Sequence, residues 1–187
     1  MGHPAAAHSG LVTADELLRV PEDGFRRELV EGAVIVMAPA GEEHGTVAAE
    51  ILVRLGQYVR SKGLGRVYTA ETGFKIASDP DTVLAPDAAF VRRERIEQTG
   101  VGQGYRLGAP DMVVEVVSPN DSFGAVEAKV SQWLAARCRM VIVVNPRRRA
   151  ATVYRSRSDI VILAEDDELD GGEVVPGWRL PVRELFA

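Results

Sequence analysis

The sequence predicts an α/β (α+β) domain in which a mixed β-sheet is flanked by helices and preceded by an N-terminal β-hairpin. Three patterns indicate this fold class. The run Met112–Val117 consists mostly of β-branched residues, which is typical of a strand buried on both faces. Apolar residues recur at helical spacing between His44 and about Arg60, and a second helix is expected between about Ser122 and Cys138. Two short apolar segments separated by Glu31-Gly32 indicate the hairpin.

The other expected elements follow in chain order. Thr13 and Glu16 form the pattern of a capping box, so a short helix should run to about Val20. The further segments are hairpin strands at Phe25–Val30 and Ala33–Met37, strands at Arg66–Ala77 and Val83–Val91, a loop or short helix at Arg92–Tyr105, strands at Val141–Val144, Ala151–Arg155 and Asp159–Ala164, and an acidic loop at Glu165–Gly172.

Length and composition favour one domain. The chain has 187 residues, enough for a single core, and we expect residues 1–10 to be a disordered end and residues 11–187 to form the domain. The formal net charge of -5 neither supports nor excludes a nucleic-acid partner, since a local basic patch decides such contacts. Cys138 is the only cysteine, which excludes an internal disulfide and favours a cytoplasmic location. No apolar run approaches the roughly 20 residues of a membrane span.

Glu115 is the one ionisable residue in the run Met112–Val117. A buried carboxylate without a partner is costly, so Glu115 should have a partner or a metal ion. Asp111 lies four residues earlier on the same strand, roughly 13 Å away, which is too far to share a cation. Asp87 belongs to another strand, and neighbouring strands about 4.8 Å apart can bring two carboxylates together. The alternative is that both aspartates only begin strands after a proline.

Lys129 borders the apolar stripe of the helix that follows Glu115. A lysine in this position commonly extends outward to solvent. Beside two carboxylates, it could instead orient a water molecule and stabilise negative charge on a phosphate. Two acids, a lysine and a divalent cation suit phosphodiester hydrolysis. Two neighbouring carboxylates also predict that at least one has a raised pKa without metal.

Several stretches in a fixed order resemble the Uma family, which belongs to the restriction-endonuclease-like PD-(D/E)XK superfamily. They are R-R-E-L-V-E-G at Arg26, M-A-P followed by His44, P-D-A-A-F-V at Pro86, G-A-P-D-M-V-V-E-V-V-S-P-N-D at Gly108, then Lys129, V-V-N-P at Val143 and P-G-W-R-L-P at Pro176. The resemblance extends over nearly the whole chain from Leu11. It implies a restriction-endonuclease-like core and a Mg²⁺-dependent nuclease, with Mn²⁺ able to substitute for Mg²⁺.

The resemblance also implies roles for individual residues. Asp87 and Glu115 are the expected metal ligands, together with the backbone carbonyl of Val116. The superfamily lysine usually lies two residues after the acid; Val117 occupies that position here, and the resemblance places the lysine at Lys129.

His44 and Glu28 are further candidates for the catalytic site. A hydrogen-bonded structural histidine is the alternative for His44, and a surface ion pair is the alternative for Glu28. DNA is the expected partner, with no membrane contact, and a homodimer is left open. Two rival functions remain: a non-catalytic binding or assembly protein of the same fold, and a hydrolase acting on another phosphoester.

Overall fold

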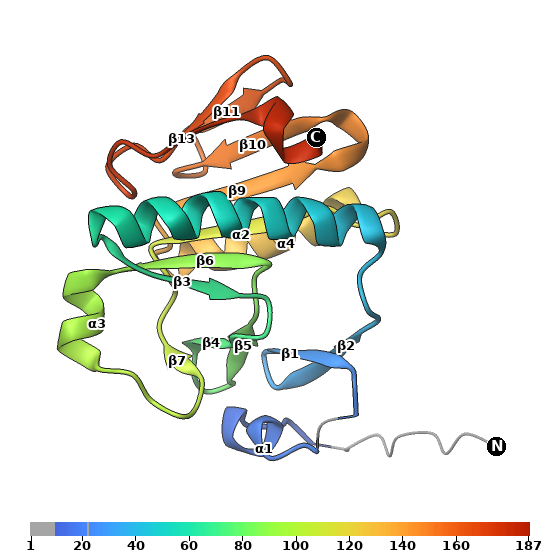
Figure 1. Cartoon of the computed structure of the whole chain (residues 1–187). Coiled ribbons are helices and arrows are strands. Elements are labelled where there is room, and N and C mark those ends of the chain that lie inside the picture. The colour runs from blue at the N-terminus through green and yellow to red at the C-terminus, as the bar shows by residue number, and fades with distance from the viewer. Residues whose placement is uncertain (1–9, 22) are drawn as a thin grey trace.

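The fold has two main β-sheets, one covered by long helices on both faces (Figure 1). The computed structural model describes residues 10–21 and 23–187, so all but Gly10 of the predicted disordered end lies outside the described residues. The helices are α1 (Ala14–Leu18), α2 (Glu42–Lys62), α3 (Arg93–Thr99) and α4 (Phe123–Ala135), with 3₁₀ turns η1 (Pro146–Arg148) and η2 (Val182–Phe186). The strands are β1 (Arg26–Val30), β2 (Ala33–Met37), β3 (Gly65–Thr69), β4 (Phe74–Ala77), β5 (Thr82–Leu84), β6 (Ala88–Arg92), β7 (Arg106–Leu107), β8 (Met112–Val116), β9 (Met140–Asn145), β10 (Ala150–Tyr154), β11 (Ile160–Leu163), β12 (Glu168–Asp170) and β13 (Arg179–Pro181).

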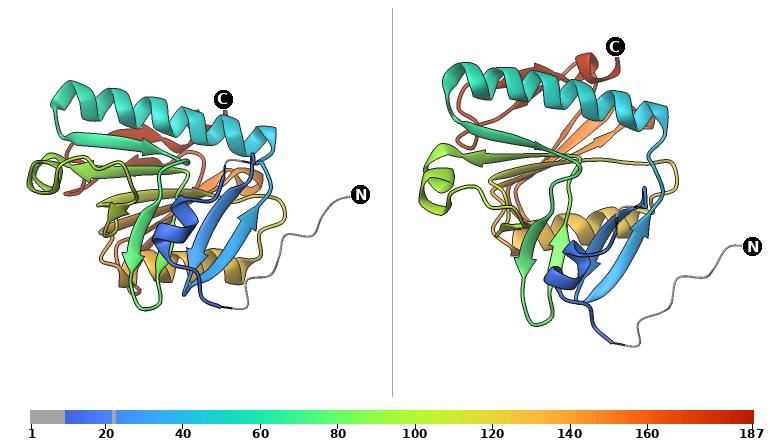
Figure 2. Two further views of the ribbon diagram at one scale, coloured as in Figure 1. Left: turned by 90° about the horizontal axis from the view of Figure 1, so that it is seen from below. Right: turned by 60° about the horizontal axis from the view of Figure 1, so that its bottom comes forward.

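The larger sheet has six strands in the order β11-β10-β9-β8-β6-β3. Strand β8 is central: it runs parallel to β9 and antiparallel to β6, and all five of its residues are buried. Helices α2 and α4 lie on opposite faces of this sheet (Figure 2). Successive residues of β8 therefore face alternate helices, and Glu115 faces the α4 side together with Val113.

Local sequence explains why the two long helices begin and end where they do. Helix α2 has acidic residues in its first turn and basic residues in its last, which suits the helix dipole, and Gly63 ends it in the left-handed conformation with φ 60°. The hydroxyl of Ser122 accepts a hydrogen bond from the amide of Ala125 at 3.2 Å and caps α4. No helix in residues 10–21 and 23–187 combines the length and apolarity needed to cross a bilayer.

The smaller sheet has five strands in the order β2-β1-β5-β4-β7. The predicted hairpin is its edge, with Arg26 paired to Met37 and Val30 to Ala33. Helix α1 covers this sheet through Leu17, and the predicted capping box is present: Thr13 and Glu16 bond reciprocally. The sequence therefore predicts the mixed sheet, the hairpin and the helices correctly.

The predictions of single strands at Arg66–Ala77 and Val83–Val91 are wrong, because each segment is divided between the two sheets. Residues 66–77 form β3 and β4, and residues 83–91 form β5 and β6. Pro86 has no N–H to continue a ladder, so the chain leaves one sheet at Leu84 and enters the other at Ala88. This crossing places Asp87 between the sheets.

Two smaller predictions are also wrong. The expected acidic loop 165–172 contains β12, which pairs with β13. Arg179 on β13 binds Glu168 at 2.8 Å and Asp170 at 3.1 Å, a cross-strand ion pairing that local composition does not reveal. The second helix, expected to end at about Cys138, ends at Ala135, and Arg137 beyond it is exposed with φ 68°.

Candidate active site

Asp87 directly precedes β6, and Glu115 lies on the neighbouring strand β8. The β6–β8 register pairs Ala88 with Val114 and Ala89 with Val113, so one further step places Asp87 opposite Glu115. The amide of Val116 donates to Asp87 Oδ2 at 2.8 Å, which keeps the two strand ends together. Both residues are buried: Asp87 is 5% exposed and Glu115 is 9% exposed.

Lys129 of α4 joins Glu115 to a third acid. Its Nζ lies 3.2 Å from Glu115 Oε2 and 3.0 Å from Glu28 Oε1. The indole Nε1–H of Trp133, one helical turn further along α4, donates to Glu115 Oε1 at 2.8 Å. Glu28 lies on β1 and also accepts a bond from the amide of Ala85 at 2.9 Å. The site therefore connects both sheets and α4.

This environment raises the pKa of Glu115 to about 7. Burial is the largest cause, and the charges of Asp87 and Glu28 add to it, while Lys129 and Trp133 act in the opposite direction. Burial would lower the pKa of Lys129, but the charges of Glu115 and Glu28 outweigh burial and raise it. Lys129 is therefore a fixed cation at neutral pH. A raised carboxyl pKa agrees with the expectation from two neighbouring acids, although burial contributes more than repulsion.

Asp87 has different neighbours, and its pKa moves the other way. His44 Nε2, in the first turn of α2, lies 3.1 Å from Asp87 Oδ2, and Arg26 Nη1 lies 3.4 Å from Oδ1. Burial would raise the pKa of Asp87, but the bonds from His44 and Val116 and the charge of Arg26 lower it. The bond to Asp87 also raises the pKa of His44, against the effect of burial. Two adjacent carboxyls with pKa values displaced in opposite directions are typical of catalytic sites.

Comparisons with known proteins place the chain in a family. The model of the Uma2 family, described as "Putative restriction endonuclease", matches residues 14–183. The chain belongs to this family. A search of curated proteins found no match. Among solved structures, the chain is similar to "a putative nuclease belonging to DUF820 from Anabaena variabilis", with 21% sequence identity, a TM-score of 0.79, and coverage of 94% of this chain and 97% of the other. This likeness confirms the predicted fold class.

The structure brings together every site residue predicted for this Uma2 family member. Asp87, Glu115 and Lys129 form the centre, and Glu28 and His44 each contact one of them. The alternative for Glu28, a surface ion pair, is wrong because the residue is only 4% exposed.

Asp111 lies apart from this cluster, as the sequence argument required. Its Oδ2 accepts a bond from the amide of Arg92 at 2.9 Å and lies 3.1 Å from Arg95 Nη1. Asp111 therefore has a structural role at the start of β8.

Sequence reasoning missed two members of the site, Arg26 and Trp133. Arg26 precedes Glu28 by two residues, so the period of a strand places both on one face of β1. Trp133 follows Lys129 by four residues, which places both on one face of α4. These spacings are visible in the sequence, but they identify partners only once Glu28 and Lys129 are known to face the site.

The carboxylate pair fits a Mg²⁺ ion. Among residues 10–21 and 23–187, no three or more His, Cys, Asp and Glu side chains are grouped to hold a metal. Mg²⁺ usually keeps several waters and is bound by one or two carboxylates together with substrate phosphates. Asp87 and Glu115 supply such a pair of hard oxygen donors. The structure shows the amide of Val116 bonded to Asp87, and the predicted role of its carbonyl as a ligand stays a prediction.

Proposed function

We propose that this protein is a Mg²⁺-dependent endonuclease that hydrolyses DNA phosphodiester bonds, with Mn²⁺ able to substitute. The observation that carries the proposal is the buried pair Asp87–Glu115 with the Lys129 amine 3.2 Å from Glu115. Membership of a family described as "Putative restriction endonuclease" supports the same reaction. A cytoplasmic location belongs to this proposal, and a homodimer is a prediction that sedimentation velocity can check.

The exposure of the charged groups favours an anionic substrate. The acid side chains lie deep, with 7% of Asp87, 11% of Glu115 and 5% of Glu28 exposed. The cations reach further outward, with 25% of the Lys129 side chain and 23% of the Arg26 side chain exposed. A phosphodiester that approaches from solvent therefore meets positive charge first, and the acids remain available beneath it for a cation.

Five side chains of the site have a definite part in this proposal. A Mg²⁺ ion held by Asp87 and Glu115 would polarise a phosphate oxygen and acidify a bound water. Lys129 stays protonated, so it orients the attacking water and stabilises charge on the phosphate instead of accepting a proton. Glu28 holds the Lys129 amine from the opposite side, and Trp133 fixes the orientation of the Glu115 carboxylate.

A cleavage assay with matched variants tests the proposal. The wild-type protein should cut plasmid or single-stranded DNA with Mg²⁺ or Mn²⁺, and EDTA should stop it. Glu115→Gln should lose both metal binding and cleavage, while Lys129→Gln should keep the metal and lose about 10²–10³ in rate. Asp111→Asn is the control for loss of a buried acid outside the site and should cleave normally.

Two results would contradict the proposal. The first is a wild-type protein that cuts no DNA with either metal while it binds DNA or a protein partner tightly; this result favours the rival binding protein. The second is full activity in Lys129→Gln, which would show that Lys129 takes no part in the reaction. Cleavage of another phosphoester without cleavage of DNA would keep the chemistry and change the substrate.

A further inference from the structure

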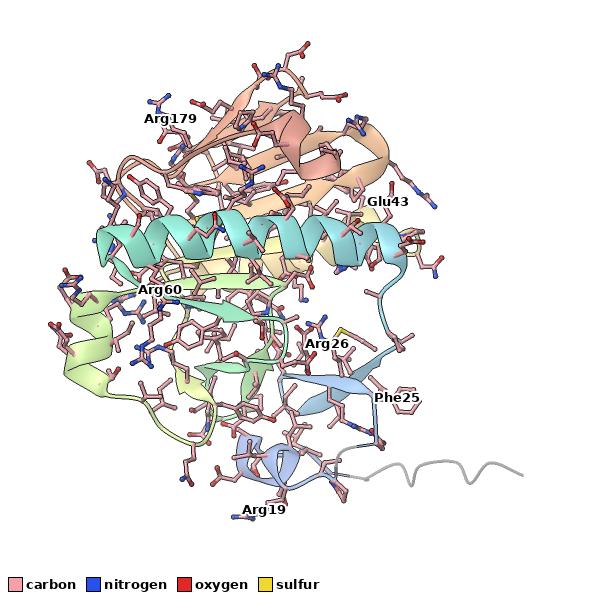
Figure 3. The ribbon with its side chains drawn as sticks, in the orientation of Figure 1. Arg19, Phe25, Arg26, Glu43, Arg60 and Arg179 are labelled. Atoms are coloured by element: carbon pink, nitrogen blue, oxygen red, sulfur yellow. The ribbon has the colours of Figure 1, made fainter. Side chains whose placement is uncertain are left out.

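We infer that Arg26 is a substrate-binding residue that holds a phosphate group of DNA beside Asp87, an inference that rests on the proposed endonuclease function. Arg26 is the first residue of β1 and pairs with Met37 of β2. Its side chain extends from the hairpin into the region between the hairpin and α2 (Figure 3). This position places a guanidinium at the edge of the candidate active site.

The hydrogen bonds of the guanidinium are incomplete. Its Nη2 donates to the carbonyl of Ala85 at 2.8 Å. Its Nη1 lies 3.4 Å from Asp87 Oδ1, longer than the roughly 2.7–2.9 Å of a strong charge-assisted bond. Its Nε is buried and has no hydrogen-bond partner among the described residues. Nη1 is therefore the donor of this guanidinium whose present bond an additional oxygen ligand can improve.

The bond to Ala85 fixes the orientation of Arg26 in advance. Glu28, two residues along the same face of β1, accepts a bond from the amide of Ala85 at 2.9 Å. Both polar groups of Ala85 are thus held by side chains of β1. Because Nη2 is anchored to Ala85, Nη1 is held in a fixed place beside Asp87, where it can donate to a phosphate oxygen.

Each carboxylate of the proposed metal pair has one cationic side chain beside it. Arg26 lies beside Asp87 as Lys129 lies beside Glu115, and both cations are partly exposed. Arg26 lies farther from the Asp87 carboxylate, at 3.4 Å, than His44 at 3.1 Å and the amide of Val116 at 2.8 Å. The contact with Arg26 is therefore the one that Asp87 can exchange when it binds a divalent cation. A DNA phosphate held at the same cation would then take the Nη1 donor of Arg26 in place of Asp87.

Arg27 provides a matched control for Arg26. It is the next residue of β1, points to the opposite face, and has a similar exposure of 19%. Its guanidinium binds Asp23, including an Nη1–Oδ1 bond of 2.8 Å, and contacts no member of the site. Loss of Arg27 therefore removes one charge from β1 without removing the proposed phosphate contact.

The test measures DNA affinity as a function of salt concentration. The proteins are the wild type, Arg26→Met, Arg26→Lys and Arg27→Met, and the probe is a short fluorescent duplex followed by anisotropy. Ca²⁺ replaces Mg²⁺ to slow cleavage. Arg26→Met should bind about tenfold more weakly, and its slope of log affinity against log salt should fall by about 0.9, the loss of one phosphate contact. Arg26→Lys should keep the slope with weaker binding, and Arg27→Met should match the wild type.

Two outcomes of this measurement would overturn the inference. An Arg26→Met protein with wild-type affinity and slope would show that Arg26 touches no phosphate. Equal loss of affinity in Arg26→Met and Arg26→Lys, with unchanged slopes and lowered melting temperatures, would show that Arg26 only supports Ala85. Cleavage by wild-type protein in Mg²⁺ is measured on the same preparations; its absence would contradict the proposed function, while the salt slope still decides the role of Arg26.

Discussion

Replacing Glu115 by Gln should stabilise the metal-free protein, and the gain should grow with pH. Burial, with the charges of Asp87 and Glu28, raises the pKa of Glu115 from an ordinary value of 4.5 to about 7 in the folded protein. A raised carboxyl pKa favours folding below pH 4.5, and this contribution is lost as pH rises through about 7. At 1.36 kcal/mol for each pH unit, the ionisation of Glu115 costs the folded protein about 3 kcal/mol above that range.

The glutamine variant isolates this cost because it resembles the protonated carboxyl in shape. Its amide oxygen can still accept the bond from Trp133, and Lys129 keeps its contact of 3.0 Å with Glu28. Urea unfolding in EDTA should show no difference between the two proteins near pH 4.5. At pH 8 the variant should be more stable by about 3 kcal/mol. Parallel stability curves for the two proteins across this range would show that Glu115 does not have a raised pKa in the folded protein.

The control for this measurement is Glu173→Gln. The side chain of Glu173 is 95% exposed and lies 3.7 Å from Arg139, so removal of its charge should leave the pH dependence of stability unchanged. Mg²⁺ should stabilise the wild-type protein at pH 8 by mass action but should not stabilise Glu115→Gln.

Three further predictions concern the buried groups. Trp133→Phe removes the indole bond of 2.8 Å to Glu115, so Mn²⁺ affinity measured by electron paramagnetic resonance should fall about tenfold; an unchanged affinity would contradict the positioning role. Burial raises the pKa of the Cys138 thiol to about 12, so a thiol reagent at pH 8 should label it only in urea, and rapid labelling of the folded protein would refute this. Asp87→Asn should lose the rise in melting temperature with Mg²⁺, whereas Asp111→Asn, an equally buried acid, should keep it; an equal rise in both would place the ion elsewhere.

The centre of the site is predictable because a charged residue interrupts an otherwise apolar strand pattern. A glutamate within a β-branched run is anomalous unless it has a partner, and this anomaly alone singles out Glu115 in the sequence. The separation of strand neighbours then selects Asp87 and excludes Asp111. Lys129 requires only that a helix follow the strand and fold back over it, and α4 covers the face of β8 that carries Glu115.

The rest of the site depends on how the two sheets meet. Glu28 looks like a surface residue because Arg26 and Arg27 precede it, and only the packing of β1 near Ala85 and α4 buries it. The division of residues 83–91 at Pro86 is equally invisible to local pattern, since apolar residues continue on both sides of the break.

Arg26 and Trp133 show why residue type alone is insufficient. A tryptophan on an apolar stripe looks like a core residue, and Trp133 is indeed fully buried, yet its one polar atom decides the orientation of Glu115. An arginine at the start of a strand looks like a solvated end, yet Arg26 reaches both Ala85 and Asp87. Such roles come from hydrogen-bond geometry, which sequence spacing alone does not identify.

The most direct test of the central claim is a crystal soaked in Mn²⁺ and measured for anomalous scattering. One strong peak should lie between Asp87 and Glu115, within a bond length of about 2.0–2.2 Å of an oxygen from each carboxylate. Lys129 and Trp133 should remain beside Glu115, and Arg26 should have lost its contact with Asp87. A peak that touches neither carboxylate, or no peak in crystals of a protein that binds Mn²⁺ in solution, would contradict the claim that this pair is the metal centre of a nuclease.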